Sequence, residues 1–246
     1  MIAPDDLSLT DAEVLETLAR GELELLGLLP RSSNYTFLAR VRTGVDELLA
    51  VYKPQVGEAP LWDFPDGTLF RREVAAYVVA TALGWPRIPP TLERDGPHGV
   101  GSVQRFLPFD PEHHYFTMQD DPRHLATFRR VALFDEVVNN ADRKSGHCLL
   151  AEDGDLFFVD HGVCFSVEPK LRTVIWAFAG EPITPAEGDD LRSFRAALEQ
   201  DRVRDRLASL LSPAEVGAVV GRVDTLLGTG RLPRPGPERP YPWPPV

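Results

Sequence analysis

Residues 137–162, VVNNADRKSGHCLLAEDGDLFFVDHG, place two polar clusters on either side of a short apolar hairpin. A carboxylate at the end of an apolar strand, as in LFFVD, costs free energy unless it is paired or binds a cation. Because a hairpin can bring its two ends to one edge, we expect Asp142, His147 and Asp160 to lie close together. Such groups suit a divalent cation, with one aspartate left to orient a hydroxyl. The alternative is that each aspartate only caps a turn.

The composition narrows the class of protein. The chain has 246 residues and a net charge of −11, which argues against a general nucleic-acid-binding surface. It contains no run of eighteen apolar residues, and its start, MIAPDDLSLTDAEVL, does not have the pattern of a signal peptide. Two cysteines, Cys148 and Cys164, are too few for a disulfide framework or a structural zinc site. We therefore expect no transmembrane segment, no nucleic-acid partner and a cytoplasmic location.

The predicted elements differ between the two halves. Hydrophobic spacing predicts a helix at 8–20, strands at 22–29, 35–42, 47–52, 91–93 and 100–107, and a helix at 69–83. From residue 122 it predicts helices at 122–140, 170–179, 188–200 and 213–228, interrupted by a hairpin at 148–159. The expected fold class is α+β, with a β-rich lobe at 1–107 and an α-rich lobe at 108–232. A proline-rich tail, 233–246, is a possible ligand for a protein partner.

The motifs resemble those of a known fold. A catalytic aspartate, a metal-binding side chain five residues later and D-x-G after the next hairpin resemble the catalytic loop and metal motif of protein-kinase-like folds. N-x-D-R without a preceding H-R-D is similar to the phosphatidylinositol 3-/4-kinases and the HipA-type bacterial kinases. More closely, the chain resembles an actinobacterial family, with no assigned activity, that is grouped with the phosphatidylinositol 3-/4-kinase-like proteins. The resemblance covers about residues 22–200 and implies a two-lobed fold.

The resemblance assigns roles to the residues that match its motifs. Asp142 would orient the acceptor hydroxyl and take its proton, while Asp160 and His147 would hold Mg²⁺ or Mn²⁺. Lys53, at the end of the third strand, would hold the α- and β-phosphates of ATP. Glu73, on the next helix, would hold that lysine.

Further residues would contact the nucleotide. Hydroxyls and backbone N–H groups of the turn that contains Ser32, Ser33 and Asn34 would cover the phosphates. The segment Gln104, Arg105, Phe106 would be the hinge whose backbone meets adenine. The loop 55–68 would be a lid or a substrate platform.

Two departures keep other functions open. His147 stands where these families usually have asparagine, and imidazole suits Mn²⁺ or Zn²⁺ better than Mg²⁺. His161 stands where kinases have an apolar residue. We expect an ATP- and metal-dependent phosphotransferase whose unidentified acceptor is a lipid, a small molecule or a protein, with AMP transfer as a variant. The alternative is a nucleotide-binding pseudokinase that acts as a signalling scaffold. A metal-dependent hydrolase is a weaker option, because it leaves Lys53 and Glu73 unexplained.

Overall fold

The computed structural model describes residues 9–30, 34–44, 46–236 and 239–246. The chain divides into two compact units. The N-terminal unit comprises the residues up to Tyr77 and Pro89–Pro108, and the C-terminal unit comprises Val78–Ile88 and Phe109–Val246. The predicted division into a lobe at 1–107, a lobe at 108–232 and a tail at 233–246 remains a prediction, which limited proteolysis would check.

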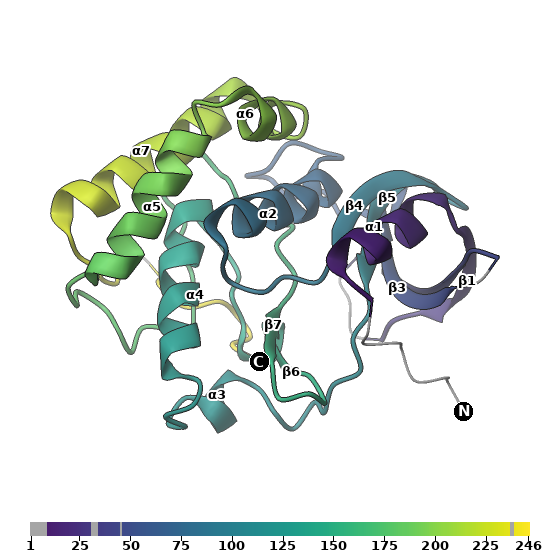
Figure 1. The fold of residues 1–246 in the computed structure, drawn as a ribbon, viewed down its shortest axis with the longest axis horizontal. Coiled ribbons are helices and arrows are strands. Elements are labelled where there is room, and N and C mark those ends of the chain that lie inside the picture. The colour runs from purple at the N-terminus through teal and green to yellow at the C-terminus, as the bar shows by residue number, and fades with distance from the viewer. Residues whose placement is uncertain (1–8, 31–33, 45, 237–238) are drawn as a thin grey trace. The chain divides into compact units, whose positions relative to one another are not determined.

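The N-terminal unit is built on a five-stranded antiparallel sheet with the order β1-β2-β3-β5-β4. Its strands are β1 (Glu22–Leu28), β2 (Phe37–Arg42), β3 (Glu47–Pro54), β4 (Thr91–Gly96) and β5 (Gly99–Arg105). Helix α1 (Asp11–Arg20) packs on this sheet through the fully buried Val14 and Leu18 (Figure 1). The predicted strands are confirmed, and β3 is the central one.

Helix α1 begins with a capping box at Thr10. The Thr10 hydroxyl accepts a hydrogen bond from the Glu13 N–H at 3.4 Å, and the Glu13 carboxylate accepts from the Thr10 N–H at 2.8 Å. This capping box satisfies two backbone donors at the helix start. Ser8, the first residue of the predicted helix, lies outside the described residues.

Helix α2 (Leu69–Leu83) begins after the short 3₁₀ turn η1 (Gln55–Gly57) and an irregular loop. The Glu58 carboxylate accepts hydrogen bonds from the N–H groups of Leu69 and Phe70, at 3.0 and 2.8 Å. A carboxylate at this place satisfies orphan N–H groups and the positive end of the helix dipole. The loop between β3 and α2 therefore fixes where α2 starts.

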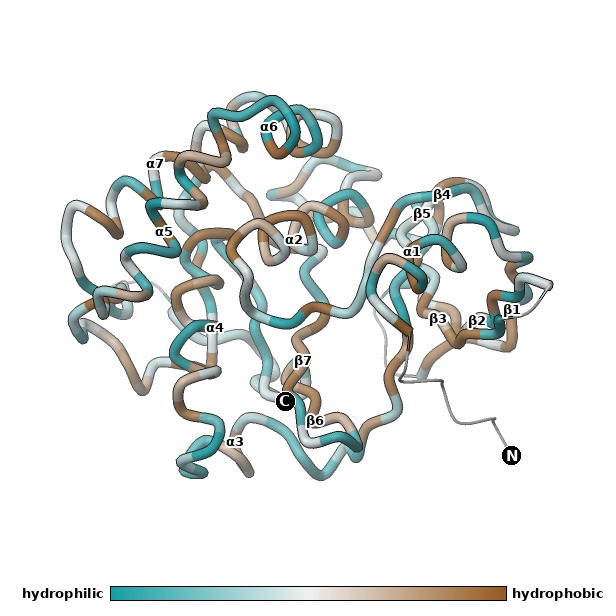
Figure 2. Tube along the Cα trace, viewed as in Figure 1, coloured by the Kyte–Doolittle hydropathy of each residue, from teal (hydrophilic) through white to brown (hydrophobic). Residues whose placement is uncertain are grey.

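The C-terminal unit is mostly helical. It contains α3 (Tyr115–Met118), α4 (Leu125–Val138), α5 (Pro185–Ala197), α6 (Asp201–Ala208) and α7 (Pro213–Thr229). The turn η2 (Ser145–His147) leads into the hairpin of β6 (Cys148–Leu150) and β7 (Leu156–Phe158). Figure 2 shows apolar residues along β7 and α4. The rings of Phe128 on α4 and Phe158 on β7 meet edge to face, with their centroids 6.4 Å apart. No helix in the described part of the chain is long and apolar enough to cross a bilayer.

One helix prediction in this unit is wrong, and two short helices were not predicted. Residues 170–179 form no helix, and the unpredicted helices are α3 and α6. The Arg172 N–H donates to the Asn140 carbonyl at 2.9 Å, and the Val174 N–H donates to the Arg143 carbonyl at 3.1 Å. The backbone groups that a helix needs internally are thus bonded to the loop after α4, so tertiary pairing overrides the local pattern.

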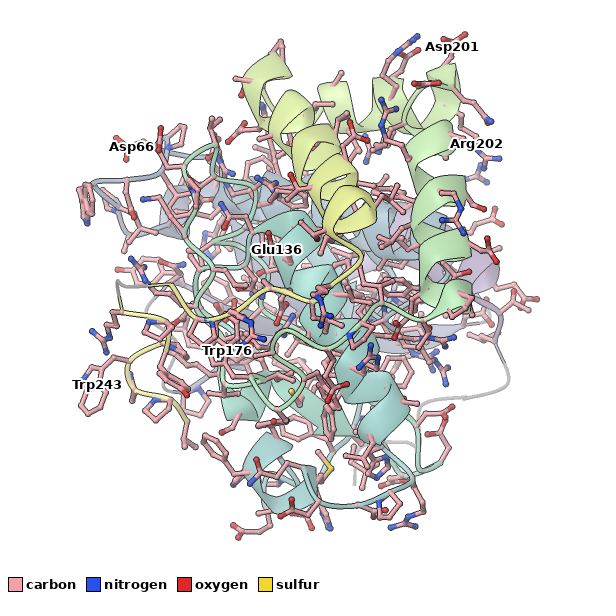
Figure 3. The ribbon with its side chains drawn as sticks, turned by 90° about the vertical axis from the view of Figure 1, so that its left-hand side faces the viewer. Asp66, Glu136, Trp176, Asp201, Arg202 and Trp243 are labelled. Carbon is pink, nitrogen blue, oxygen red and sulfur yellow. The ribbon has the colours of Figure 1, made fainter. Side chains whose placement is uncertain are left out.

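The described part of the proline-rich tail, 233–236 and 239–246, forms hydrogen bonds with the rest of the C-terminal unit. The Pro240 carbonyl accepts from the Thr173 N–H at 3.0 Å and from the Trp176 indole N–H at 3.1 Å. The Pro245 carbonyl accepts from the Ser145 N–H at 2.9 Å. Figure 3 labels Trp176 and, on the tail, the exposed Trp243. The tail therefore supplies hydrogen-bond acceptors to the loop after α4, at Ser145, and to the segment at Thr173 and Trp176 that bonds to that loop.

Candidate functional site

The N-terminal unit pairs the predicted lysine with the predicted glutamate. The Lys53 ammonium on β3 donates to the Glu73 carboxylate on α2. The Glu73 side chain is 3% exposed and that of Lys53 is 23% exposed. A buried carboxylate needs a cation partner, and a lysine held in this way points in a fixed direction. The Lys53 ammonium is therefore held in place and is partly exposed, and the Glu73 carboxylate balances its charge.

The predicted hinge residues are engaged within the same unit. The Gln104 side-chain amide donates to the Thr91 hydroxyl at 2.8 Å, so the buried Gln104 points into the protein. The N–H groups of Arg105 and Phe106 donate to the carbonyls of Pro90 and Leu49, both at 2.9 Å. Contacts of these residues to a base would have to use groups other than these two N–H donors.

The predicted phosphate-covering turn is described only in part. Ser32 and Ser33 lie outside the described residues. The Asn34 side-chain oxygen accepts from the Ala59 N–H at 2.8 Å. Asn34 thus ties this turn to the loop that follows β3.

Asp142 follows directly after the end of α4 in the C-terminal unit. Asn139 ends the helix in a left-handed conformation with φ of 51°, and the Asp142 N–H donates to the Asn140 side-chain oxygen at 3.0 Å. Burial raises the pKa of Asp142 to about 6, and the negative charge of Asp160 adds to the rise, although the ammonium of Lys144, 3.4 Å away, opposes it. An acid with a pKa near neutral is suited to proton transfer.

His147 and Asp160 meet as the hairpin argument predicts. The His147 Nε2 lies 3.3 Å from the Asp160 Oδ2. The His147 Nδ1 accepts from the Lys144 N–H at 3.3 Å. A neutral imidazole with this bond carries its proton on Nε2 and donates it to Asp160. To ligate a cation through Nε2, the ring would have to move its proton to Nδ1 and release the Lys144 N–H.

Asp160 has an uncommon backbone conformation. It follows β7 with φ of 62°, in the left-handed region, and its side chain is 52% exposed. A non-glycine residue in this region costs free energy and persists only where its surroundings hold it. The carboxylate is thus aimed by its backbone and is accessible.

The donor set limits what this cluster could hold. No group of three or more His, Cys, Asp or Glu side chains in the described part of the chain is arranged to bind a metal ion. Asp160 and His147 could supply two ligands. Mg²⁺ commonly takes one or two carboxylates and completes its shell with phosphate oxygens and water. The residues fit a cation that arrives with a nucleotide better than a permanently bound one.

Two residues that were not predicted from the sequence anchor this cluster. Asp135 on α4 and Arg143 are fully buried and form an ion pair, with Arg143 Nη2 2.9 Å from Asp135 Oδ1. Asn140 donates to the same oxygen at 3.0 Å. A signal was present, because an aspartate inside the apolar pattern VALFDEVV requires a buried partner.

Comparisons with known proteins place the chain among relatives. No family model matches it. Protein Rv2133c of Mycobacterium tuberculosis is 40% identical over 264 aligned residues, which cover 92% of this chain and 93% of that protein. Phosphatidylinositol 4-kinase gamma 4 of rice, Oryza sativa subsp. japonica, is 30% identical over 136 residues, which are 46% of this chain but only 24% of the rice protein.

A solved structure has the same fold. The crystal structure of the Helicobacter pylori proinflammatory kinase CtkA matches with a TM-score of 0.51 and 10% identity, over 85% of this chain and 92% of that one. A sheet-based N-terminal unit and a helical C-terminal unit agree with that likeness. The chain belongs to the family of the mycobacterial protein Rv2133c, and it has the two-lobed, protein-kinase-like fold.

Proposed function

We propose that this chain is an ATP- and divalent-metal-dependent phosphotransferase related to the phosphatidylinositol 3-/4-kinase-like group. The observation that carries the proposal is the pairing of Lys53 with the buried Glu73 in a chain that also keeps Asp142 and Asp160 around a hairpin. Support for the group comes from the sequence match to part of the rice phosphatidylinositol 4-kinase.

The chemistry assigns one role to each side chain. Lys53 would pair with the α- and β-phosphates. The acceptor O–H would hydrogen-bond to Asp142, its oxygen would form the new bond to the γ-phosphorus as the bond to ADP breaks, and its proton would pass to the Asp142 carboxylate. A pKa of about 6 leaves this carboxylate ionised at pH 7.5 and able to accept the proton.

Asp160 and His147 would hold the divalent cation. When bound, the cation would neutralise charge on the phosphate oxygens. The half-exposed Asp160 is the stronger ligand candidate, because His147 can join only after its ring proton moves. We therefore propose Mg²⁺ or Mn²⁺ with the nucleotide, and an acceptor that is a lipid, a small molecule or a protein.

One observation favours a second candidate, a nucleotide-binding pseudokinase that acts as a scaffold. His147 Nε2 already lies 3.3 Å from one oxygen of the Asp160 carboxylate, so a cation would have to compete with this contact or bind through the other oxygen. Such a protein would bind nucleotide weakly in the presence of metal and would not turn it over.

The first test is thermal unfolding with ATP or GTP, in Mg²⁺ and separately in Mn²⁺, for wild type and Asp160→Ala. A ligand at one hundred times its Kd stabilises by about 2.7 kcal/mol. In a chain of this size that is a rise in Tm of roughly 5 to 10 °C. Asp120→Ala is the matched control, because Asp120 is exposed and lies outside the hairpin motif.

The outcomes separate the two candidates. A metal-dependent shift in wild type and Asp120→Ala that disappears in Asp160→Ala supports the nucleotide site. ADP formation that Asp142→Ala abolishes then supports the enzyme, and binding without ADP formation supports the pseudokinase. Absence of any shift with both nucleotides and both metals would refute both candidates.

A further inference from the structure

A buried charge pair in the C-terminal unit has no role in the chemistry described so far. The side chains of Asp135 and Arg143 are 0% exposed, and Arg143 Nε also lies 3.1 and 3.2 Å from the two Asp135 oxygens. Removing two charges from water costs several kcal/mol, so a pair of this kind contributes little net stability. Its location calls for another explanation.

The remaining donors of Arg143 reach both neighbours of Asp160. Nη1 donates to the Val159 carbonyl at 3.1 Å, and Nη2 lies 2.7 Å from the Nε2 of the fully buried His161. A guanidinium can only donate, so His161 Nε2 is the acceptor and the ring proton lies on Nδ1. Arg143 therefore contacts both Val159, which precedes Asp160, and His161, which follows it.

The residue between these two contacts, Asp160, has a left-handed backbone with φ of 62°. A residue in that region costs roughly 1–3 kcal/mol and stays there only when its surroundings over-determine it. Two hydrogen bonds from one rigid, planar group supply such a constraint.

The same cluster also holds the other functional aspartate. Asn140 donates to Asp135 through Nδ2 at 3.0 Å and accepts from the Asp142 N–H through Oδ1 at 3.0 Å. Asp142 is also the residue directly before Arg143. One carboxylate on α4 thus anchors the backbone at Asp142 and, through Arg143, the backbone at Asp160.

We propose that Asp135, Arg143 and His161 are positioning residues that fix the Asp160 carboxylate for cation binding, with the His161 imidazole serving as a hydrogen-bond acceptor for Arg143. The proposal rests on the proposed function, since Asp160 is its metal ligand. It gives a reason for histidine at a position where kinases have an apolar residue: an apolar side chain could not accept the Arg143 N–H. Groups behind metal ligands typically change metal affinity 10- to 100-fold when replaced.

The test compares an apolar replacement with a replacement that keeps a neutral acceptor. Mn²⁺ is titrated into full-length protein with excess ATP, and bound Mn²⁺ is followed by electron paramagnetic resonance for wild type, His161→Leu and His161→Gln. We expect His161→Leu to raise the half-saturating Mn²⁺ concentration at least tenfold and His161→Gln to raise it less than threefold. His124→Leu is the control, because His124 is a buried histidine on the same unit that contacts Phe128.

Amide hydrogen exchange at residues 159–162 is measured in the same proteins without nucleotide. Exchange at least tenfold faster in His161→Leu than in His161→Gln is expected, because a merely smaller core would affect both variants. If His161→Leu does not fold, His161→Met, an apolar side chain of closer length, takes its place.

Failure of the positioning proposal and failure of the proposed function give different results. If wild type binds Mn²⁺–ATP and His161→Leu has unchanged Mn²⁺ affinity, the positioning proposal is wrong and the proposed function stands. The same conclusion follows if His161→Leu and His161→Gln lose Mn²⁺ affinity equally. No Mn²⁺–ATP binding by wild type would overturn the function, and hydrogen exchange then decides whether His161 holds the Asp160 backbone.

Discussion

Replacing Asp142 by asparagine should stabilise the protein at neutral pH while it removes the proposed catalytic base. Burial raises the pKa of this carboxyl to about 6 from a usual value of 3.8, helped by the charge of Asp160. The folded state therefore prefers the protonated acid. Asparagine is similar in shape and carries no charge, so it avoids the cost of ionising this site.

The sign and the pH window follow from the two pKa values. A group with a raised pKa in the folded state adds its stability fully below about pH 3.8 and loses it as the pH rises through about 6. Above pH 7 the wild type carries the whole penalty. A difference of 2.2 units at 1.36 kcal/mol per unit is about 3 kcal/mol. Because the side chain is 32% exposed, solvent screening reduces this, and we expect roughly 1–3 kcal/mol.

The assay is urea unfolding of wild type, Asp142→Asn and Asp120→Asn at pH 7.5 and at pH 4.5. The gain of Asp142→Asn over wild type should fall to roughly a third at pH 4.5, because nearly all folded chains then carry a neutral Asp142 and the pH is only about 0.7 units above the unfolded pKa of 3.8. The exposed Asp120 should give no gain at either pH. A gain of equal size at both pH values, or no gain at pH 7.5, would refute the reasoning.

Three further predictions concern other parts of the chain. Lys53→Met should abolish the nucleotide-dependent rise in Tm, while Lys170→Met should keep it; a shift that survives in Lys53→Met would contradict the role of the Glu73 pair. Phe158→Ala should lower the free energy of unfolding by about 3–5 kcal/mol, because Phe158 is fully buried, and a loss below 1 kcal/mol in urea would show that the hairpin repacks. Deleting residues 239–246 should lower the free energy of unfolding by roughly 1–3 kcal/mol, because it removes the acceptors for the Ser145 and Thr173 N–H groups. An unchanged Tm would show that water replaces these acceptors.

The sequence predicts well those parts of the fold whose signals are local. The strands, α1 and α2 follow from hydrophobic spacing and caps, and the order of strands places Lys53 and Glu73 where their side chains meet. His147 and Asp160 also come together, because a three-residue pairing of β6 with β7 brings the ends of the hairpin to one edge. In each case the local sequence determines which side chains come together.

The errors lie where distant segments compete for the same backbone groups. Apolar residues at 170–179 have helical spacing, yet this segment bonds to the loop after α4 and to the tail at Pro240. Neither partner is visible in a local pattern. The Asp135–Arg143 pair was missed for the same reason, because its meaning depends on contacts between residues that only the fold brings together.

The two aspartates of the candidate site destabilise the folded protein, and both are held in place through Asp135 on α4. Asp142 is ionised against burial and Asp160 is held in a left-handed backbone, so each destabilises the folded state by itself. Both are attached to α4 through Asp135, whose helix is covered by α7: Arg222 on α7 donates to the Val137 carbonyl at 2.9 Å, next to the Glu136 labelled in Figure 3. A strained site must be held by a rigid part of the molecule, and a helix that is packed in the core is rigid. If the anchor were only structural, removing the acceptor at His161 would change stability alone. A parallel change in cation affinity is what distinguishes an anchor that serves function.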